Sequence, residues 1–269
     1  MGKLNIVKAS EIYYPLRFLV YAGSGGGKTH LAMQANMVRG MAPAIILSGD
    51  WGTATARHTD ILVAMLDSSD VLTELLAGIK SKKYPFKTVI LDGMSQFYDT
   101  IVLEKSGEQL PQIQDWLKAS FDVKKIIRQF TRLGVNIIVT CLDQLLSEEE
   151  GGVNYTVPLV PGKMAFRLAE AFDIVGHTTT KSTPQGPHYI MRVQTGKRTI
   201  AKDRGGTLGA AEVDITWDGS GRPPMADIWT KWTTLSSATQ EESSVSKVVS
   251  DTIEPGELTE DEVLLDLAG

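Results

Sequence analysis

Residues 22–29 read Ala-Gly-Ser-Gly-Gly-Gly-Lys-Thr and stand between an apolar run and a stretch of helix-forming residues. The run at 17–21 has the apolar, aromatic and β-branched composition of a buried strand. Residues 31–38 contain neither Pro nor Gly and are rich in helix formers. A strand, a glycine loop and a helix in this order form the context of a P-loop. A flexible Gly/Ser linker is the alternative, but a linker requires neither the Lys-Thr pair nor flanking core elements.

The glycines of this loop allow the backbone to take positive φ angles and to pass close to a polyphosphate. Their N–H groups then converge on phosphate oxygens at the positive end of a helix. We expect Lys28 to reach the β and γ phosphates of ATP and Thr29 to hold Mg²⁺. Ala22 stands where the common pattern has its first glycine. The residues predicted to bind nucleotide are Gly23, Ser24, Gly25, Gly26, Gly27, Lys28, Thr29 and His30.

Length and composition favour one α/β domain with a tail. The chain has 269 residues, of which 42% are hydrophobic and 22% charged, as in ordinary soluble proteins. It contains no apolar run of about 18 residues and no signal-peptide core at its start, so we expect a cytoplasmic protein with no membrane partner. The lone cysteine, Cys141, ends an apolar run and is expected to be a small buried residue. The four histidines are scattered and indicate no zinc site.

Charge is distributed unevenly along the chain. Residues 237–269 carry nine acids against Lys247, a net charge of −8, so the total of −5 leaves +3 on the other 236 residues. The polar stretch at 233–240 marks the boundary, which gives a core at 1–232 and a flexible acidic tail at 233–269. A slightly basic core with an acidic tail is compatible with nucleic-acid binding.

Short apolar runs alternate with helical stretches in the first two thirds of the chain, which predicts an α/β fold with a mostly parallel sheet flanked by helices. Strands are expected at 44–47, 88–92 and 136–140, and helices at 70–80 and 115–133. Beyond residue 151, Gly and Pro turns separate shorter runs that are typical of β-hairpins. These runs cover 173–179, 188–194 and 198–202.

The helix expected at 115–133 is amphipathic. Its apolar residues near one face are Leu117, Phe121, Ile127, Phe130 and Leu133. Its cations are Lys118, Lys124, Lys125, Arg128 and Arg132. The cations suit either a phosphate-binding surface or an ordinary solvent face.

Acidic and polar residues follow the expected strands at their carboxyl ends, where α/β sheets bind ligands. Asp92 follows four apolar residues and is expected at the carboxyl end of a buried strand. It is predicted to orient Mg²⁺ as a Walker B carboxylate, and the alternative is that it only forms the turn at the strand end. Asp50 follows the second strand and could either activate the attacking water or cap the next turn. Thr140 or Gln144, after the fourth strand, could sense the γ-phosphate, although a surface loop residue would look the same.

These motifs together resemble RecA-like core ATPases, especially the short phage-encoded recombinases. The resemblance spans about residues 15–210 and includes the P-loop, Asp50, the run at 89–95, the Asp143-Gln144 pair and the segment 199–206. It implies a ring or filament with nucleotide between subunits, in which Lys202 and Arg204 reach the γ-phosphate of a neighbour. A solvated, charged strand end is the alternative for these two cations.

The resemblance also implies two loops that hold single-stranded DNA, near 104–112 and 147–163. The second contains Gly151, Gly152, Asn154, Tyr155 and Lys163, which suit backbone contacts and base stacking. It also contains three acids at 148–150 that would repel phosphate, so a plain hairpin is the alternative.

The expected function is therefore a Mg²⁺-dependent ATPase that binds single-stranded DNA and promotes phage recombination or annealing in an infected bacterial cell. A small-molecule kinase and a nucleotide-switched adaptor without turnover are the alternatives. The tail ends in an acidic and apolar segment, 259–267, with capping-box spacing between Thr259 and Glu262. This segment could dock on a phage or host DNA-binding protein, compete with DNA for the core, or simply keep the protein soluble.

Overall fold

A mixed sheet with the P-loop strand near its middle forms the framework of the protein. The computed structural model describes residues 13–234 except 51, 53–55, 57–58, 148–153, 162–163 and 185. Ten strands belong to the sheet within these residues. The strands are β1 (Arg17–Ala22), β2 (Ala44–Ser48), β3 (Leu62–Met65), β4 (Thr88–Asp92), β5 (Asn136–Ser147), β6 (Asn154–Pro158), β7 (Ile174–Thr183), β8 (Gly186–Arg192), β9 (Lys202–Asp203) and β10 (Glu212–Asp214).

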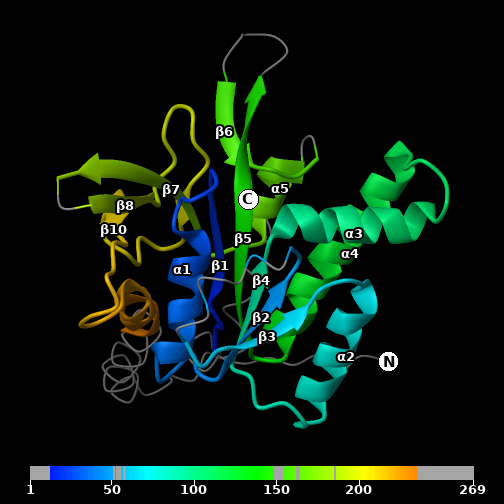
Figure 1. Cartoon of the computed structure of the whole chain (residues 1–269), viewed down its shortest axis with the longest axis horizontal. Helices are drawn as coiled ribbons and strands as arrows, with labels where there is room; N and C mark the ends of the chain where they lie inside the picture. The colour runs from blue at the N-terminus through cyan, green and yellow to red at the C-terminus, as the bar shows by residue number, and fades with distance from the viewer. Residues whose placement is uncertain are drawn as a thin grey trace, which may run out of the picture. The chain divides into compact units, whose positions relative to one another are not determined.

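The strand order is β10-β8-β7-β1-β5-β4-β2-β3, with β6 paired to β5 and β9 paired to β7. The strands from β7 to β3 in this order pair in parallel, and β8 and β10 add antiparallel pairs at one edge. Parallel neighbours place the ends of β1, β2, β4 and β5 at one edge of the sheet (Figure 1). The predicted fold class, a mostly parallel sheet flanked by helices and followed by antiparallel hairpins, is confirmed.

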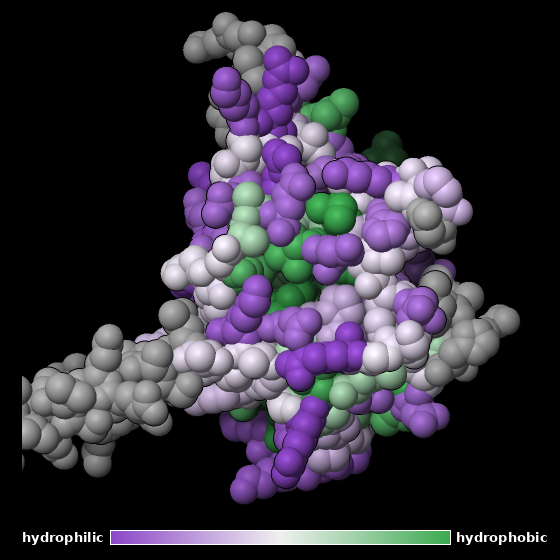
Figure 2. Space-filling view, turned by 90° about the vertical axis from the view of Figure 1, so that its left-hand side faces the viewer, coloured by the Kyte–Doolittle hydropathy of each residue, from purple (hydrophilic) through white to green (hydrophobic). Residues whose placement is uncertain are grey.

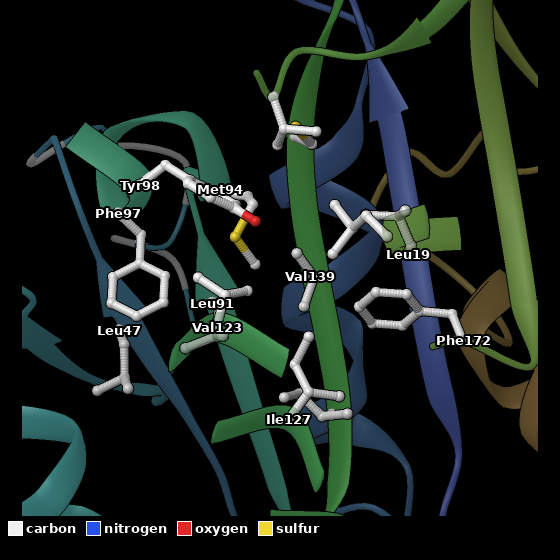
Figure 3. Packing of buried hydrophobic residues seen from close by; sticks show 14 of the residues in the cluster. Leu19, Leu47, Leu91, Met94, Phe97, Tyr98, Val123, Ile127, Val139 and Phe172 are labelled. Atoms are coloured by element: carbon white, nitrogen blue, oxygen red, sulfur yellow. The ribbon is translucent and has the colours of Figure 1, made fainter. Parts of the chain in front are cut away.

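Helices cover both faces of this sheet. The labelled helices are α1 (Lys28–Met33), the 3-10 helix η2 (Gln34–Met37), α2 (Ser69–Lys80), α3 (Met94–Ser106), α4 (Ile113–Arg132) and α5 (Met164–Glu170), and a further helix covers 224–234. Side chains of α2 to α5 pack on one face with Leu19 and Val139, whereas α1, η2 and helix 224–234 pack on the other with Phe18 and Ile138. This division follows from the strand period of two, and Figure 3 shows the first cluster, with Phe172 beside Leu19.

The buried side of α4 differs from the apolar face expected from the sequence. Ile127 and Phe130 are buried as predicted, but Leu117 and Phe121 are exposed. The buried stripe includes Ala119 and Val123, each two positions after one of these exposed residues. Because a helix turns about 100° per residue, two positions correspond to roughly 200°, which places Leu117 and Phe121 on the outer side. The helix therefore presents bulky apolar groups outward.

Several elements differ from the sequence prediction. β3 and α3 were not expected, and β5 continues past residue 140 to Ser147 and turns back through β6 as a hairpin. The run at 198–202 forms a strand only from Lys202. Within the described part of the chain, no helix combines the length and apolar character needed to cross a membrane.

Two of the sequence predictions concern segments for which the structure gives little or nothing. The acidic tail from residue 235 onward, and Gly151, Gly152 and Lys163 of the second DNA loop, lie outside the described residues. Helix 224–234 crosses the boundary predicted at 232/233, and Trp232 is buried in the core. The division into a core and a tail stays a prediction.

Candidate nucleotide-binding site

The loop between β1 and α1 depends on glycine at specific positions. Gly25 and Gly27 have φ angles of +74° and +77°, which side-chain-bearing residues rarely adopt. A Cβ atom on Gly26 would lie 2.5 Å from the Cβ of Ala22. The carbonyl of Gly26 accepts a 2.6 Å hydrogen bond from the Thr178 hydroxyl of β7, so a neighbouring strand fixes the loop. The sequence folds here into a tight loop that opens into the first turn of α1.

Lys28 begins α1 and turns back over the loop. Its Nζ donates to the carbonyls of Ala22 at 3.0 Å and Gly23 at 2.7 Å. Burial lowers the pKa of this amine, while the carboxylates of Asp143 and Asp92 act in the opposite direction. A phosphate oxygen at the loop would give this half-buried ammonium a negatively charged partner in place of the two neutral carbonyls, which makes a stronger hydrogen bond.

Asp92 lies at the end of β4 and is held by two hydroxyl groups. Thr29 Oγ1 donates to its two carboxylate oxygens at 2.9 and 3.1 Å, and Thr140 Oγ1 donates to Oδ1 at 2.5 Å. The N–H of Gly93 in turn donates to Thr140 Oγ1 at 3.0 Å. Burial raises the pKa of Asp92, and the hydrogen bonds from Thr140 and Thr29 partly offset this rise. The Thr29–Asp92 pair predicted from the two motifs is therefore brought together.

These groups line a cavity of about 640 Å³, within the usual range for nucleotide-sized ligands. Carboxylates and hydroxyls stand at its Asp92 end, and two aromatic rings come from the C-terminal strands and the segment after them. The residues that line it are Ser24, Gly25, Gly26, Gly27, Lys28, Thr29, His30, Asp50, Gly52, Asp92, Gly93, Gln96, Thr140, Cys141, Leu142, Tyr189 and Trp217. Cys141 is buried, and burial raises the pKa of its thiol to about 12, so it is not a reactive thiol.

His30 contributes to the aromatic side of the cavity. Its ring lies 5.6 Å from that of Trp217, and its Nε2 lies 3.2 Å from the Trp217 carbonyl oxygen. Tyr189 of β8 packs directly on the loop, since a Cβ on Gly27 would meet its ring at 3.0 Å. Aromatic faces of this kind suit a nucleotide base, which stacks on them. Figure 2 views the molecule from the side that carries β8, and hydrophilic residues there surround a hollow with a hydrophobic floor.

Asp50 and Gly23, two of the predicted site residues, fit the cavity only in part. Asp50 lines it, and the same carboxylate accepts a 2.8 Å hydrogen bond from the N–H of Gly52. Asp50 thus fits both interpretations, a pocket residue and a turn residue. Gly23 does not line the cavity, but its carbonyl accepts from Lys28 and from the N–H of Gly26.

Three other predicted residues lie away from the cavity. The Gln144 amide donates to the carbonyls of Pro158 and Val160 at 3.1 and 2.8 Å, so the geometry favours Thr140 over Gln144 near the phosphates. Lys202 donates to the Phe172 carbonyl at 2.7 Å, and Arg204 pairs with Asp173 at 3.2 Å. Their roles toward nucleotide stay predictions.

Sequence reasoning missed Gln96, Tyr189 and Trp217. Gln96 lies in the first turn of α3 and lines the cavity, and its side-chain oxygen is buried without a hydrogen-bond partner among the described residues. Its position four residues after Asp92, on a helix that starts at a strand's carboxyl end, is a signal that could have identified it. Tyr189 and Trp217 follow Lys28 by more than 150 residues and carry no local motif.

The donor set fits Mg²⁺ bound together with ATP. Among the described residues, no group of three or more His, Cys, Asp or Glu side chains could hold a metal ion alone. Thr29 and Asp92 supply one hydroxyl and one carboxylate ligand. Mg²⁺ in nucleotide sites commonly has only one or two protein ligands, and phosphate oxygens and water complete its coordination shell. A resident metal with only protein ligands would not fit here.

The cavity is also connected to the root of the β5–β6 hairpin. Tyr21 of β1 donates through its hydroxyl to the carbonyls of Thr156 at 3.1 Å and Ile200 at 2.5 Å. Asp143 of β5 lies 3.7 Å from where a Cβ on Gly23 would stand, and it also contacts His177 Nε2 at 3.3 Å. Burial lowers the pKa of His177, which keeps the ring neutral at pH 7. The P-loop strand is thus hydrogen-bonded directly to β6 and to the segment that precedes Lys202.

Comparison with protein families supports the nucleotide-binding assignment. The family model described as "AAA domain" matches residues 14–205 of this chain. Among solved structures, a KaiC-like protein from the hyperthermophilic archaeon Pyrococcus horikoshii OT3 is 12% identical, with a TM-score of 0.44, over 71% of this chain and 83% of that one. No curated protein matches the sequence. Because the family model covers well over half of the chain, including the P-loop and Asp92, the chain belongs to the AAA domain family of P-loop NTPases.

Proposed function

We propose that this protein is a Mg²⁺-dependent ATP hydrolase whose turnover is coupled to single-stranded DNA, and that it acts in phage recombination or annealing. The observation that carries the enzymatic part is the contact between Thr29 and both oxygens of Asp92, directly beside the glycine loop. A P-loop hydroxyl and a strand-end carboxylate in contact form the usual protein share of a Mg²⁺–nucleotide site.

Each group of residues at the site has a separate proposed role in phosphoryl transfer. The backbone N–H groups of the loop and the Lys28 ammonium bind the phosphates and offset their charge. Thr29 and Asp92 would hold Mg²⁺, which neutralises charge on the phosphates when bound. Gln96 and Asp50 line the same cavity. The Gln96 amide is available to orient the attacking water, and the Asp50 carboxylate is available to accept its proton. Tyr189 and Trp217 offer ring faces to the base.

The link to DNA is proposed from the hairpin. β5 and β6 continue beyond the edge of the sheet at which the P-loop stands (Figure 1). Tyr21 joins the P-loop strand to that hairpin through its hydrogen bond to the Thr156 carbonyl, and Asp143 at the hairpin root lies beside Gly23 of the loop. A change in the loop on nucleotide binding can therefore move the hairpin, and a ligand on the hairpin can act back on the loop. Tyr155 on β6 is half-buried, and its ring could stack on a base.

The proposed active site also includes cations from a neighbouring subunit. Arg204 is half-exposed and pairs with Asp173, which also accepts two hydrogen bonds from Arg17. Because Asp173 keeps Arg17 as a partner, Arg204 can leave it and stabilise charge at a site on the next subunit of a ring or filament. Lys202 donates to three carbonyls at and just after the end of α5, and it would join Arg204 at the γ-phosphate of that neighbour.

The test is the rate of ATP hydrolysis by the full chain, measured with and without Mg²⁺, single-stranded DNA and small-molecule phosphate acceptors. We expect Mg²⁺-dependent turnover that single-stranded DNA stimulates and that Lys28→Ala abolishes. Retained hydrolysis in Lys28→Ala would contradict the site. Phosphate transfer to a small molecule would favour a kinase, and nucleotide binding without turnover would favour an adaptor.

A further inference from the structure

The outward side of α4 begins with bulky apolar residues that nothing in the described core covers. Ile113, Leu117 and Phe121 are 80%, 53% and 74% exposed, and their spacing of four residues puts them on one face. Leu110, just before the helix, is also exposed. Contiguous exposed apolar groups of this size mark interaction surfaces in soluble proteins.

The same side of α4 continues as a row of cations. Lys125, Arg128 and Arg132 are exposed and follow Phe121 by four, seven and eleven positions, which keeps them on one face. The two acids of α4 do not offset them, because Asp115 is buried and Asp122 is half-buried and pairs with Lys105 at 2.8 Å. The α4 outer face, residues 113–132, is therefore apolar in its first half and cationic in its second.

The C-terminal segment 257–267 has the complementary composition in the reverse order. It opens with Glu257 and the three acids at 260–262, and it continues with the apolar run 263–265 and Leu267. Placed antiparallel to α4, its acids would meet Lys125, Arg128 and Arg132, and its apolar run would cover Ile113, Leu117 and Phe121. We propose that segment 257–267 docks on the α4 outer face in this direction.

The chain is long enough for this contact. Residues 235–256 connect the last described residue, Thr234, to the segment, and 22 residues span at most roughly 75 Å when extended. A core of this size is about 45 Å across, from the general relation between chain length and radius of gyration. The segment can therefore reach α4 of its own core or of an adjacent copy.

Disulfide capture in the full-length protein tests the contact. The one native cysteine, Cys141, is buried, so the background is low. Leu117→Cys combined with Leu264→Cys should form a disulfide at least tenfold faster than the control pair, Leu62→Cys with Leu264→Cys. Leu62 on β3 is 59% exposed, similar to Leu117, and it lies on a different element. Equal rates for the two pairs would overturn the proposal.

A charge swap in the Leu117→Cys/Leu264→Cys background tests the direction of docking. Lys125→Glu with Arg128→Glu should slow capture severalfold at low salt, and adding Glu260→Lys with Glu262→Lys should restore it. The swap should lose its effect near 1 M salt, where charges are screened beyond about 3 Å. Cross-linked monomers would support docking within one chain, and dimers joined through residues 117 and 264 would support docking on a second copy. Dimers joined through residue 117 on both chains would instead make the α4 outer face an interface between copies and overturn the proposal.

Discussion

Thr140→Val isolates the contribution of the hydroxyl that holds Asp92. Valine keeps the shape of threonine but removes the donor to Asp92 Oδ1 and the acceptor for the Gly93 N–H. Thr140 is almost fully buried, so water does not readily replace either partner. The substitution should therefore act on the orientation and charge of Asp92, with no change in the volume of the core.

The size of the effect follows from these two bonds. A hydrogen bond to a charged group contributes about 1.5–3 kcal/mol, so the free energy of unfolding should fall by that order. Loss of a group that orients a metal-binding carboxylate typically weakens metal affinity or activity about 10- to 100-fold. The Thr140 bond also lowers the pKa of Asp92, so its removal should raise that pKa further. Because protonated Asp92 cannot hold Mg²⁺, the loss of activity on acidification should begin at a higher pH in the variant.

The assay is ATP hydrolysis titrated with Mg²⁺ at several pH values, combined with urea unfolding. Thr88→Val is the matched control, since Thr88 is equally buried on the same strand as Asp92 and donates to the Met41 carbonyl at 2.7 Å. Both variants should lose stability, and only Thr140→Val should require more Mg²⁺ and shift its acid limit. An unchanged Mg²⁺ requirement in Thr140→Val, or an equal change in Thr88→Val, would refute the reasoning.

Three further predictions concern the site and the core. Asp92→Asn should abolish Mg²⁺-dependent hydrolysis yet stabilise the fold at neutral pH. Burial raises the pKa of Asp92, so ionisation of its carboxyl group costs the folded state stability as the pH rises above the ordinary value near 3.8. Asn does not ionise and therefore avoids this cost. Urea unfolding at pH 3, pH 4 and pH 7 should show almost no gain at pH 3 and a larger gain at pH 7 than at pH 4. Ile127→Ala should lower the free energy of unfolding by about 2–5 kcal/mol and Leu117→Ala by less than about 0.5, and similar values would mean that α4 faces the sheet differently. Gly27→Ala, forced to φ +77°, should cost about 1–2 kcal/mol and weaken nucleotide binding roughly tenfold by calorimetry. Gly107→Ala, at φ +59° in open space, should cost stability without affecting that affinity.

The sequence alone was enough for the features that depend on neighbouring residues. The glycine loop at 22–29, the strand before it and the acid that ends β4 are all encoded within short windows. Parallel strands then bring Thr29 and Asp92 to one edge of the sheet, because the crossover connections leave their carboxyl ends together. The α/β class and the Thr29–Asp92 contact were therefore predictable.

Features that depend on helix orientation or on distant pairs were not predictable in this way. The apolar residues of α4 form two stripes, and only packing on the sheet decided that Ala119, Val123 and Ile127 are buried and Phe121 is not. Amphipathic spacing gives a helix a preferred face, but two competing faces leave its rotation to the tertiary contacts.

Tertiary contacts also decided which residues line the cavity away from the P-loop. Tyr189 and Trp217 reach the P-loop region only because β8 pairs with β7 and the segment after β10 returns to His30 of α1, more than 150 residues after Lys28. Gln144 was expected at the cavity, but β5 continues as a hairpin strand there, and its amide bonds to the chain near β6. The sequence by itself determined the phosphate end of the site, where one loop supplies the chemistry. The tertiary structure decided the base end and the outer surface, since those contacts join residues that no local pattern relates.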